Sequence, residues 1–204
     1  MQLAIGQYTA TSAVGAGLNA MHEAIRTGQS GLRRNDLERC DLDTWIGRVD
    51  GVESVELPDS VAHLYSRNNQ LAWLGLQQDG MLDSIAALME RAGPERIGIV
   101  MGTSTSSIGR TEEAYRQLLP SGAMPPEFCQ PQVQNLHSPG IFVQAVTGIT
   151  GPSLTISTAC SSSAKVFASA ARWINHGLVD AVVVGGVDSL CMSILYGFNS
   201  LELV

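Results

Sequence analysis

The sequence has little charge of either sign and almost no lysine. Of its 204 residues, 15% are charged, Lys165 is the single lysine, and the other eleven basic residues are arginines. The formal net charge is −7. A surface that grips nucleic acid phosphates needs a clustered basic face, and three arginines between 33 and 39 are the only local concentration. The composition therefore argues against a nucleic acid partner.

Long apolar runs are also missing. A membrane-spanning helix needs roughly 18 to 20 predominantly apolar residues, and the longest dense apolar stretches of this chain have only the length of strands. No basic region precedes an apolar segment at the N-terminus, so a secretory signal cannot be recognised. We therefore expect no membrane span and a cytoplasmic location.

Metal-ligand and disulfide spacings are absent as well. The cysteines and histidines are far apart in the sequence, with no C-x-x-C pair among them: Cys40, Cys129, Cys160 and Cys191; His22, His63, His137 and His176. Dispersed residues of this kind do not match the spacing of zinc sites. In a reducing compartment such cysteines are free thiols. We expect neither a metal nor a cofactor.

The composition that is present is that of a globular chain long enough to bury a core, with 45% hydrophobic residues, 21 Gly and 8 Pro. Apolar spacing and turn residues predict the elements of the first two thirds. The predictions are a strand at 3–8, a helix at 18–28, irregular structure at 28–60, a helical region at 68–91 interrupted near Gly80, a strand at 97–101, a helix at 111–119, a loop at 120–131 and a helix at 138–148.

The last third has the most regular pattern. Alternation and β-branching predict a strand at 153–158, and a helical pattern follows at 161–175 with Ala164, Phe167 and Ala168 on its apolar face. A continuous apolar strand at 181–184 comes next. Strand, helix and strand at this spacing form a βαβ unit, so we expect a parallel sheet and the α/β class.

Cys160 is the leading candidate for chemistry because it lies where a strand is followed directly by a helix. The first N–H groups of that helix and the positive end of its dipole favour a thiolate there. The same N–H groups are suited to stabilise the oxyanion of an acyl group on the sulfur. The alternative is a small buried cysteine at a tight corner.

The segment 15–20, Gly-Ala-Gly-Leu-Asn-Ala, matches a dinucleotide-binding pattern with Asp36 about twenty residues further on. The fit is poor, because several residues separate the expected strand from the glycines and no second strand precedes Asp36.

Three further residues have two interpretations each. His137 could pair with Cys160 in a hydrolase-like site or be an ordinary loop histidine. Asp188 follows the strand at 181–184, where ligands of open α/β sheets bind, or it caps the next helix. Lys165 is interpreted as a solvated or paired charge.

The segment 158–163, Thr-Ala-Cys-Ser-Ser-Ser, resembles the nucleophile motif of β-ketoacyl-[acyl carrier protein] synthases. The segment 184–188, Val-Gly-Gly-Val-Asp, resembles the family's next strand and turn. The segments 28–31 and 99–104 and the pair Gly197-Phe198 also match, so that the resemblance spans nearly the whole chain.

The resemblance implies a thiolase-like fold of two similar halves, with a mixed, mostly parallel sheet covered by helices. Residues 1–204 would be the N-terminal half, and the C-terminal half, with the family's two catalytic histidines and its lysine, would be absent from this chain. The implied activity is an acyltransferase reaction in fatty-acid or polyketide synthesis, in which Cys160 holds the acyl group and malonyl-carrier protein condenses with it by decarboxylation. The implied partners are acyl carrier protein, acyl and malonyl thioesters, and a second copy joined through 153–158. Phe198 is the candidate substrate-binding residue.

Two alternatives stay open: a non-catalytic partner subunit like a chain-length factor, which usually lacks the cysteine, and a degradative thiolase, whose motif is worded differently. The helix at 161–175 carries small residues on more than one face. The resemblance implies that the missing half covers this helix, so we expect it to be exposed in this chain. We also expect the chain alone not to carry out condensation.

Overall fold

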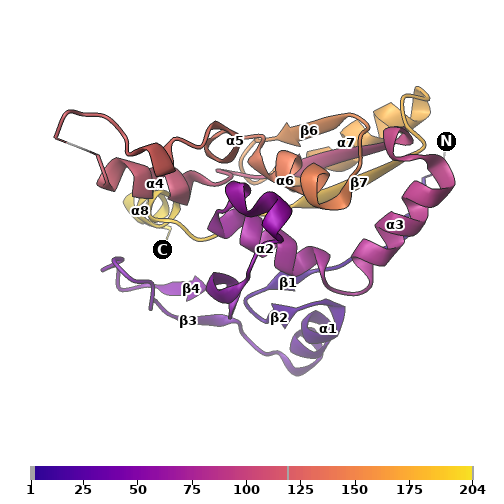
Figure 1. Ribbon diagram of the computed structural model, residues 1–204. Helices are drawn as coiled ribbons and strands as arrows, with labels where there is room; N and C mark the ends of the chain where they lie inside the picture. Colours follow the sequence, from indigo (N-terminus) through magenta and orange to yellow (C-terminus); the bar gives the residue numbers. More distant parts are fainter. Residues whose placement is uncertain (1–2, 119, 204) are drawn as a thin grey trace.

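The computed structural model describes residues 3–118 and 120–203 (Figure 1). Its helices are α1 (Leu18–Thr27), α2 (Arg67–Leu76), α3 (Met81–Ala92), α4 (Ile108–Arg116), α5 (Pro131–Gln134), α6 (Ser138–Thr147), α7 (Ser162–Asn175) and α8 (Met192–Ser200). Its strands are β1 (Thr11–Ser12), β2 (Gly15–Ala16), β3 (Leu32–Arg34), β4 (Trp45–Gly47), β5 (Ile97–Gly102), β6 (Ser153–Ile156) and β7 (Ala181–Gly186).

The central sheet has three parallel strands in the order β6-β5-β7. Strand β5 lies between the two strands of the predicted βαβ unit, so α7 crosses over it, and Ile99 is level with both Ser153 and Val183. The strands β1 with β2 and β3 with β4 form two separate antiparallel pairs. The predicted α/β class and parallel sheet are confirmed.

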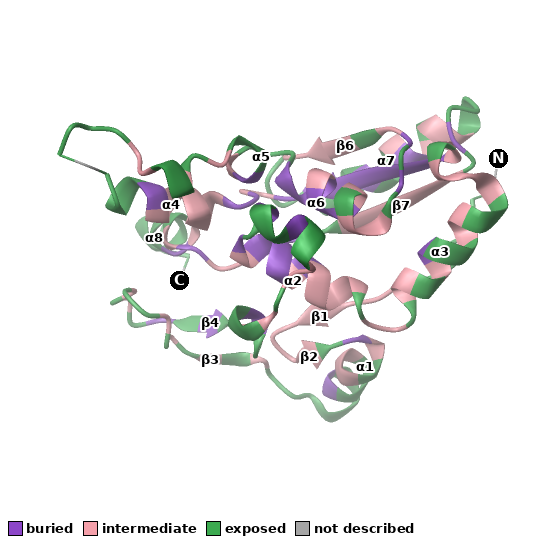
Figure 2. Ribbon diagram, viewed as in Figure 1, coloured by how far each residue is buried: buried purple, intermediate pink, exposed green. Residues whose placement is uncertain are grey.

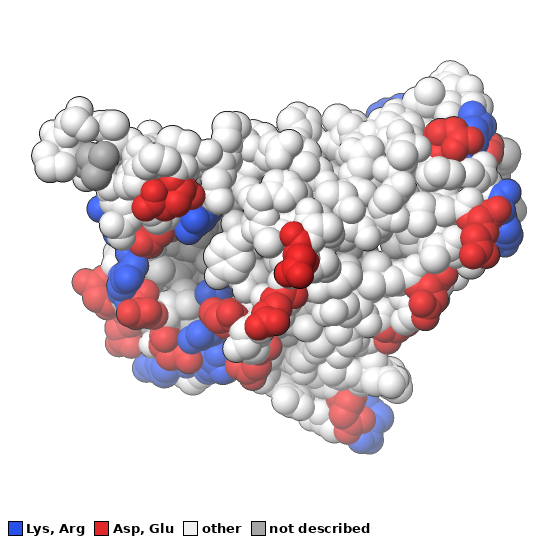
Figure 3. Space-filling model, in the orientation of Figure 1, with Lys and Arg blue, Asp and Glu red and all other residues white. Residues whose placement is uncertain are grey.

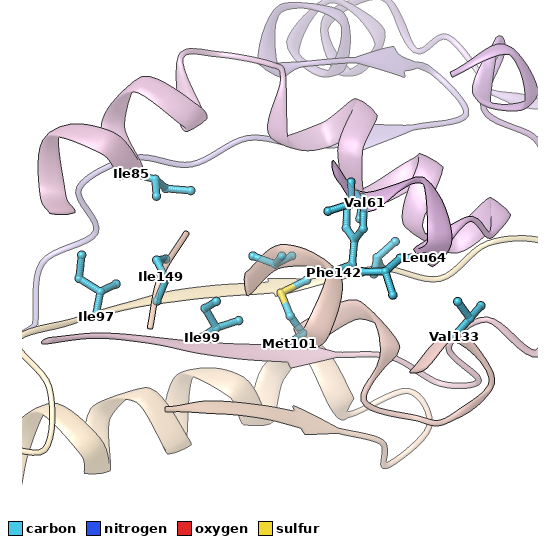
Figure 4. Close-up of a cluster of buried hydrophobic side chains, with 12 residues drawn as sticks. Val61, Leu64, Ile85, Ile97, Ile99, Met101, Val133, Phe142 and Ile149 are labelled. Carbon is cyan, nitrogen blue, oxygen red and sulfur yellow. The ribbon is translucent and has the colours of Figure 1, made fainter. Parts of the chain in front are cut away.

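One face of the sheet carries the main apolar core. Side chains alternate between the two faces of a strand, and Ile97, Ile99 and Met101 of β5 all join the same buried cluster. Figure 4 shows them directed toward Phe142 of α6 and toward Ile149, with Ile85 of α3 above. Phe142 is fully buried, so this layer of helices against the sheet stabilises the fold through buried apolar area.

Helix α7 covers the opposite face. The residues of β5 that alternate with the large ones are Gly98, Val100 and Gly102. Strand β5 is buried along its whole length between these two layers (Figure 2). The small residues on the α7 side let the helix backbone approach the sheet closely.

Two predicted glycine stops agree with the structure. Gly28 ends α1 in the left-handed region with φ 67°. Gly80, with φ 69°, separates α2 from α3 and so divides the predicted helical region in two. A positive φ of this kind strains any residue with a Cβ, which explains why glycine occupies both places.

The predicted strand at 3–8 is wrong. The first strand is β1, and none of the described residues pairs with 3–8 in a ladder. Leu3, Ile5 and Tyr8 are exposed instead. An extended apolar segment becomes a strand only when another strand supplies hydrogen-bond partners, so the local pattern was insufficient.

Two other segments, the helix at 108–116 and the region 28–60, differ from the prediction. Helix α4 begins at Ile108 and ends at Arg116, earlier than the predicted 111–119, and Leu119 lies outside the described residues. The region 28–60 was expected to be irregular, but it contains β3 and β4. These strands are only three residues long, too short for alternation to reveal.

Charge is unevenly distributed over the surface. Glu127 is the only Asp, Glu, Lys or Arg between Gln117 and Ala164, a segment that contains α5, α6 and β6. In Figure 3 the upper middle of the molecule is correspondingly white, and charged side chains gather below and at both sides. No described helix combines the length and the apolar character needed to span a bilayer.

Candidate active site

The backbone turns sharply between β6 and α7. Strand β6 ends at Ile156, and α7 begins at Ser162. Ala159 has φ 52°, a left-handed conformation that is uncommon for a residue with a Cβ. The next residue, Cys160, is exposed. Left-handed strain next to an exposed nucleophile is a recurrent feature of functional turns.

Serine hydroxyls hold this turn in place. The buried Ser162 Oγ donates to the Ala159 carbonyl at 2.6 Å and accepts from the Thr158 N–H at 2.9 Å. Ser161 Oγ lies 3.0 Å from Thr158 Oγ1. The N–H groups of Ser161 and Ser162 donate to the Thr158 and Ala159 carbonyls. These N–H groups were expected from the sequence to be free for an oxyanion, but they have carbonyl partners within the turn.

Two glycines let the start of α7 lie directly against the sheet. A Cβ at Gly102, the last residue of β5, would lie 2.8 Å from the Ser162 carbonyl carbon and from the Ser163 nitrogen. A Cβ at Gly186, the last residue of β7, would lie 2.0 Å from Ser163 Oγ. Gly102 and Gly186 therefore determine how closely the Cys160 turn approaches the ends of β5 and β7.

The Asp188 carboxylate accepts hydrogen bonds at the ends of the strands and does not cap a helix. Its Oδ1 accepts hydrogen bonds from Thr103 Oγ1 at 3.0 Å and from the Ser104 N–H at 2.6 Å. The helix-cap interpretation is wrong, because the α8 N–H groups of Met192 and Ser193 donate to the carboxylate of Glu112. That tertiary contact spans eighty residues of sequence, so no local pattern reveals it.

Phe198 lines a cavity of about 240 Å³ beside these strand ends. The lining combines apolar side chains, among them Leu71, Leu190 and Ile194, with polar ones that include Arg67 and Asp188. Cys160 is not among its lining residues. The two site residues selected from the sequence therefore lie at separate places in this chain, both near the carboxyl end of the sheet.

The cysteines differ in accessibility. Cys160 and Cys129 are exposed, Cys40 is half-buried and Cys191 is buried. Burial raises the pKa of the Cys191 thiol to about 11. Cys191 is therefore a structural thiol that stays protonated at neutral pH.

The dinucleotide interpretation of segment 15–20 does not fit the structure. Leu18, the first residue of α1, donates its N–H to Asp79 Oδ2 at 3.0 Å. A carboxylate thus occupies the helix end where a phosphate would bind. Likewise, the described ranges contain no group of three or more His, Cys, Asp or Glu suited to hold a metal ion.

The comparisons with known proteins agree on one family. The family profile described as "Beta-ketoacyl synthase, N-terminal domain" matches residues 4–204. The chain belongs to the β-ketoacyl synthase family. The recognition made from the 158–163 and 184–188 motifs is thereby confirmed.

Individual relatives match only over part of their own length. The chain is 27% identical over 186 residues to 3-oxoacyl-[acyl-carrier-protein] synthase 2 of Vibrio cholerae, an alignment covering 87% of this chain and 43% of the relative. It is 24% identical over 204 residues to the chloroplastic 3-oxoacyl-[acyl-carrier-protein] synthase I of Hordeum vulgare, covering 91% and 42%. The chain thus spans a little less than half the length of these relatives.

Solved structures confirm the fold. A chain of the complex described as ketosynthase (ApeO) with its chain length factor (ApeC) from Xenorhabdus doucetiae superposes with a TM-score of 0.78 at 31% identity, covering 94% of this chain and 48% of that one. A β-ketoacyl synthase from Burkholderia phymatum gives 0.74 at 21% identity. The predicted thiolase-like architecture of this N-terminal synthase portion is confirmed.

His137, which was considered as a partner of Cys160, lies apart from it in the hydrogen-bond network, and so does Lys165. His137 is exposed just before α6, and its N–H donates to Asn135 Oδ1 at 2.7 Å. Lys165 is exposed on α7. Within 3–118 and 120–203 no hydrogen bond joins either side chain to Cys160, so this synthase portion shows no Cys-His pair.

Helix α7 packs on the sheet through a different face from the predicted one. Its buried residues are Ser162, Val166 and Ala170, whereas Phe167 is 54% exposed and Ala164 is also exposed. The predicted apolar face is thus the outer one, and the inner face combines the buried residues with Trp173, whose ring lies against Gly98. The expectation that this chain leaves α7 partly exposed is confirmed.

Proposed function

We propose that Cys160 is the acylated nucleophile of a condensing enzyme in fatty-acid or polyketide synthesis. The supporting observation is an exposed cysteine on a strained turn at the start of α7, inside a segment matched by the synthase family. The Cys160 backbone N–H is our candidate for one oxyanion donor.

The proposed reaction has two steps. The Cys160 thiolate attacks the carbonyl carbon of an acyl thioester, and the carrier leaves as a thiol after taking up a proton, so that a new thioester forms on Cys160. A malonyl thioester then loses carbon dioxide, and the resulting carbanion attacks the Cys160 acyl carbonyl. The sulfur leaves as thiolate, and a 3-oxoacyl thioester one two-carbon unit longer is released.

The second step needs groups that stabilise the enolate formed as carbon dioxide leaves. We propose that a C-terminal half supplies them, together with a cover for the outer face of α7. The exposed Phe167 and the coverage of less than half of each relative support this division. The chain by itself is then expected to accept an acyl group without extending it.

Acylation of Cys160 is the central test. The protein is incubated with an acyl thioester of acyl carrier protein, and peptide mass spectrometry locates the adduct. We expect the adduct on Cys160 and its loss in Cys160→Ala. The matched control is Cys129→Ala, which removes the other exposed cysteine. Undiminished acylation of Cys160→Ala would refute the proposal.

We further propose that Phe198 contributes to the acyl pocket. It lines the 240 Å³ cavity together with Leu190 and Ile194, and it belongs to the Gly-Phe pair of the sequence resemblance. Replacing Phe198 with Ala should change the preferred acyl chain length while leaving acylation by the shortest donors within about twofold, since truncating a pocket wall acts on the chain it contacts. An unchanged preference would contradict this role.

A homodimer joined through β6 is the proposed assembly. This strand is at the edge of the sheet and carries Ser153, Leu154, Thr155 and Ile156, without a charge that would protect an edge. A mass measured by light scattering should be twice that of one chain. Lys replacing Thr155 should weaken the dimer, and a strictly monomeric parent protein would contradict the assembly.

A non-catalytic partner subunit is the second candidate. The observation that favours it is the similarity to a ketosynthase and chain length factor complex. The acylation test separates the two candidates, because a non-catalytic subunit forms no Cys160 thioester and acts only when mixed with an active synthase.

A further inference from the structure

The three strands of the central sheet are joined by side chains beyond the points where their ladders end. The last ladder positions are Gly102 with Ile156 on one side and Gly102 with Gly186 on the other. The chains then diverge into the Cys160 turn, the segment after β5 and the segment after β7. The Thr103 N–H donates to the Ile156 carbonyl and the Val187 N–H to the Gly102 carbonyl. Beyond these bonds, the relative position of the three segments depends on side-chain contacts.

Asp188 makes a side-chain contact between the segment after β7 and the segment after β5. Its single oxygen Oδ1 accepts from Thr103 Oγ1 and from the Ser104 N–H, at 3.0 and 2.6 Å. Both donors follow β5 directly. Hydrogen bonds to a carboxylate are stronger than those between neutral groups, so this residue fixes the path of the chain at Ser104.

Ser104 in turn contacts the segment that carries the nucleophile. Its carbonyl oxygen accepts a hydrogen bond from Ser157 Oγ at 3.0 Å, and Ser157 lies three residues before Cys160. The chain of contacts Asp188, Ser104 and Ser157 therefore crosses all three strands. It ends at the turn whose geometry presents the sulfur.

We infer that Asp188 is a positioning residue for Cys160, acting through Ser104 and Ser157. The inference rests on the proposed function for the importance of the thiol, but the geometry it predicts is measurable without any condensation. Loss of the carboxylate frees Ser104, removes a fixed partner of Ser157 and lets the Cys160 turn move relative to the start of α7. The thiol then loses its fixed position relative to the start of α7.

The test measures the rate at which iodoacetamide alkylates each cysteine of the protein, by peptide mass spectrometry across pH. Asp188→Ala should slow the alkylation of Cys160 about fivefold or more at every pH tested, because small misplacements of reacting groups have large rate effects. Ser157→Ala should act in the same direction. Asp188→Asn keeps an acceptor oxygen for both donors and should stay within about twofold of the parent.

The matched control is Asp180→Ala at the opposite end of β7. Its carboxylate also accepts two hydrogen bonds, both from Arg96, but it lies far along the strand from the turn. This control should leave the Cys160 profile unchanged. The buried Cys191 reports unfolding in every variant, because its alkylation requires the fold to open.

The outcomes are distinct. If Asp188→Ala leaves the alkylation rate of Cys160 unchanged across pH, the positioning role is overturned. If Asp188→Asn and Asp188→Ala change that rate equally, the role is also overturned, and the result indicates an effect of the Asp188 charge. If Asp188→Ala exposes Cys191, the Ser157→Ala profile decides alone. If the parent protein forms no acyl thioester on Cys160, the proposed function is refuted. The alkylation series still tests whether Asp188 positions Cys160.

Discussion

The two faces of the central sheet are built for different purposes. On one face, Ile97, Ile99 and Met101 pack into a large apolar cluster with Phe142. On the other face, Gly102 lies against the α7 backbone and Gly98 against the Trp173 ring, with Val100 between them. Bulk on the first face supplies stability through buried area. Absence of bulk on the second lets the helix that follows Cys160 approach the strand ends.

The comparison predicts that the two faces respond differently to substitution. Phe142→Ala should produce the largest loss of stability, about 3 to 5 kcal/mol in the free energy of unfolding, because it leaves a cavity in the cluster. The alkylation rate of Cys160 in the folded protein should stay within about twofold of the parent, since the α7 face is untouched. Denaturant unfolding and cysteine alkylation measure the two effects. A large change in the Cys160 rate would show that the faces are coupled.

Gly102→Ala should show the opposite balance. Its new methyl group would meet α7 backbone atoms at 2.8 Å, so the start of the helix must move, at a cost of about 1 to 3 kcal/mol. Alkylation of Cys160 should slow by about tenfold, because the turn is displaced. Gly109→Ala is the control, since its methyl group would meet only Cys191 Cβ at an ordinary 3.5 Å. Equal effects of both substitutions would break the proposed contrast.

Ionisation of the Cys191 thiol should have the smallest effect on stability, and this effect should be visible only at high pH. Burial raises the pKa of its thiol from 9.0 to about 11, so the unfolded chain loses this proton at lower pH than the folded protein does. The contribution of the protonated Cys191 thiol to the free energy of unfolding is therefore fully present below pH 9 and declines as the pH rises toward 11. The melting temperature should fall more steeply over this interval in the parent than in Cys191→Ala. Parallel curves would contradict the assignment.

The candidate site could be read from the sequence because its signals are local. A change from alternation to helical spacing at Cys160, and serines at a helix start, both act within a few residues. The same holds for the glycine stops at Gly28 and Gly80. Where one segment fixes its own conformation, the sequence prediction agreed with the structure.

The remainder depended on distant partners. The carboxylates of Asp79 and Glu112 occupy the starts of α1 and α8 from 61 and 80 residues away, and no local pattern indicates either contact. The segment 3–8 has the composition of a strand but no ladder partner in the described residues. The inner face of α7 was misassigned because it mixes Ser162, Val166, Ala170 and Trp173 and so forms no continuous apolar stripe.

The left-handed backbone at Ala159 limits which sequences can occupy the turn. A φ of 52° is open to glycine at no steric cost, is within reach of Asn and Asp, and is unfavourable for β-branched residues. If position 159 is randomised, the variants that keep the turn should therefore be those whose residue tolerates a left-handed backbone, whatever its polarity or size. Gly, Asn and Asp should keep the exposed thiol in place, and Val, Ile and Thr should be depleted even though the side chain at 159 is itself exposed.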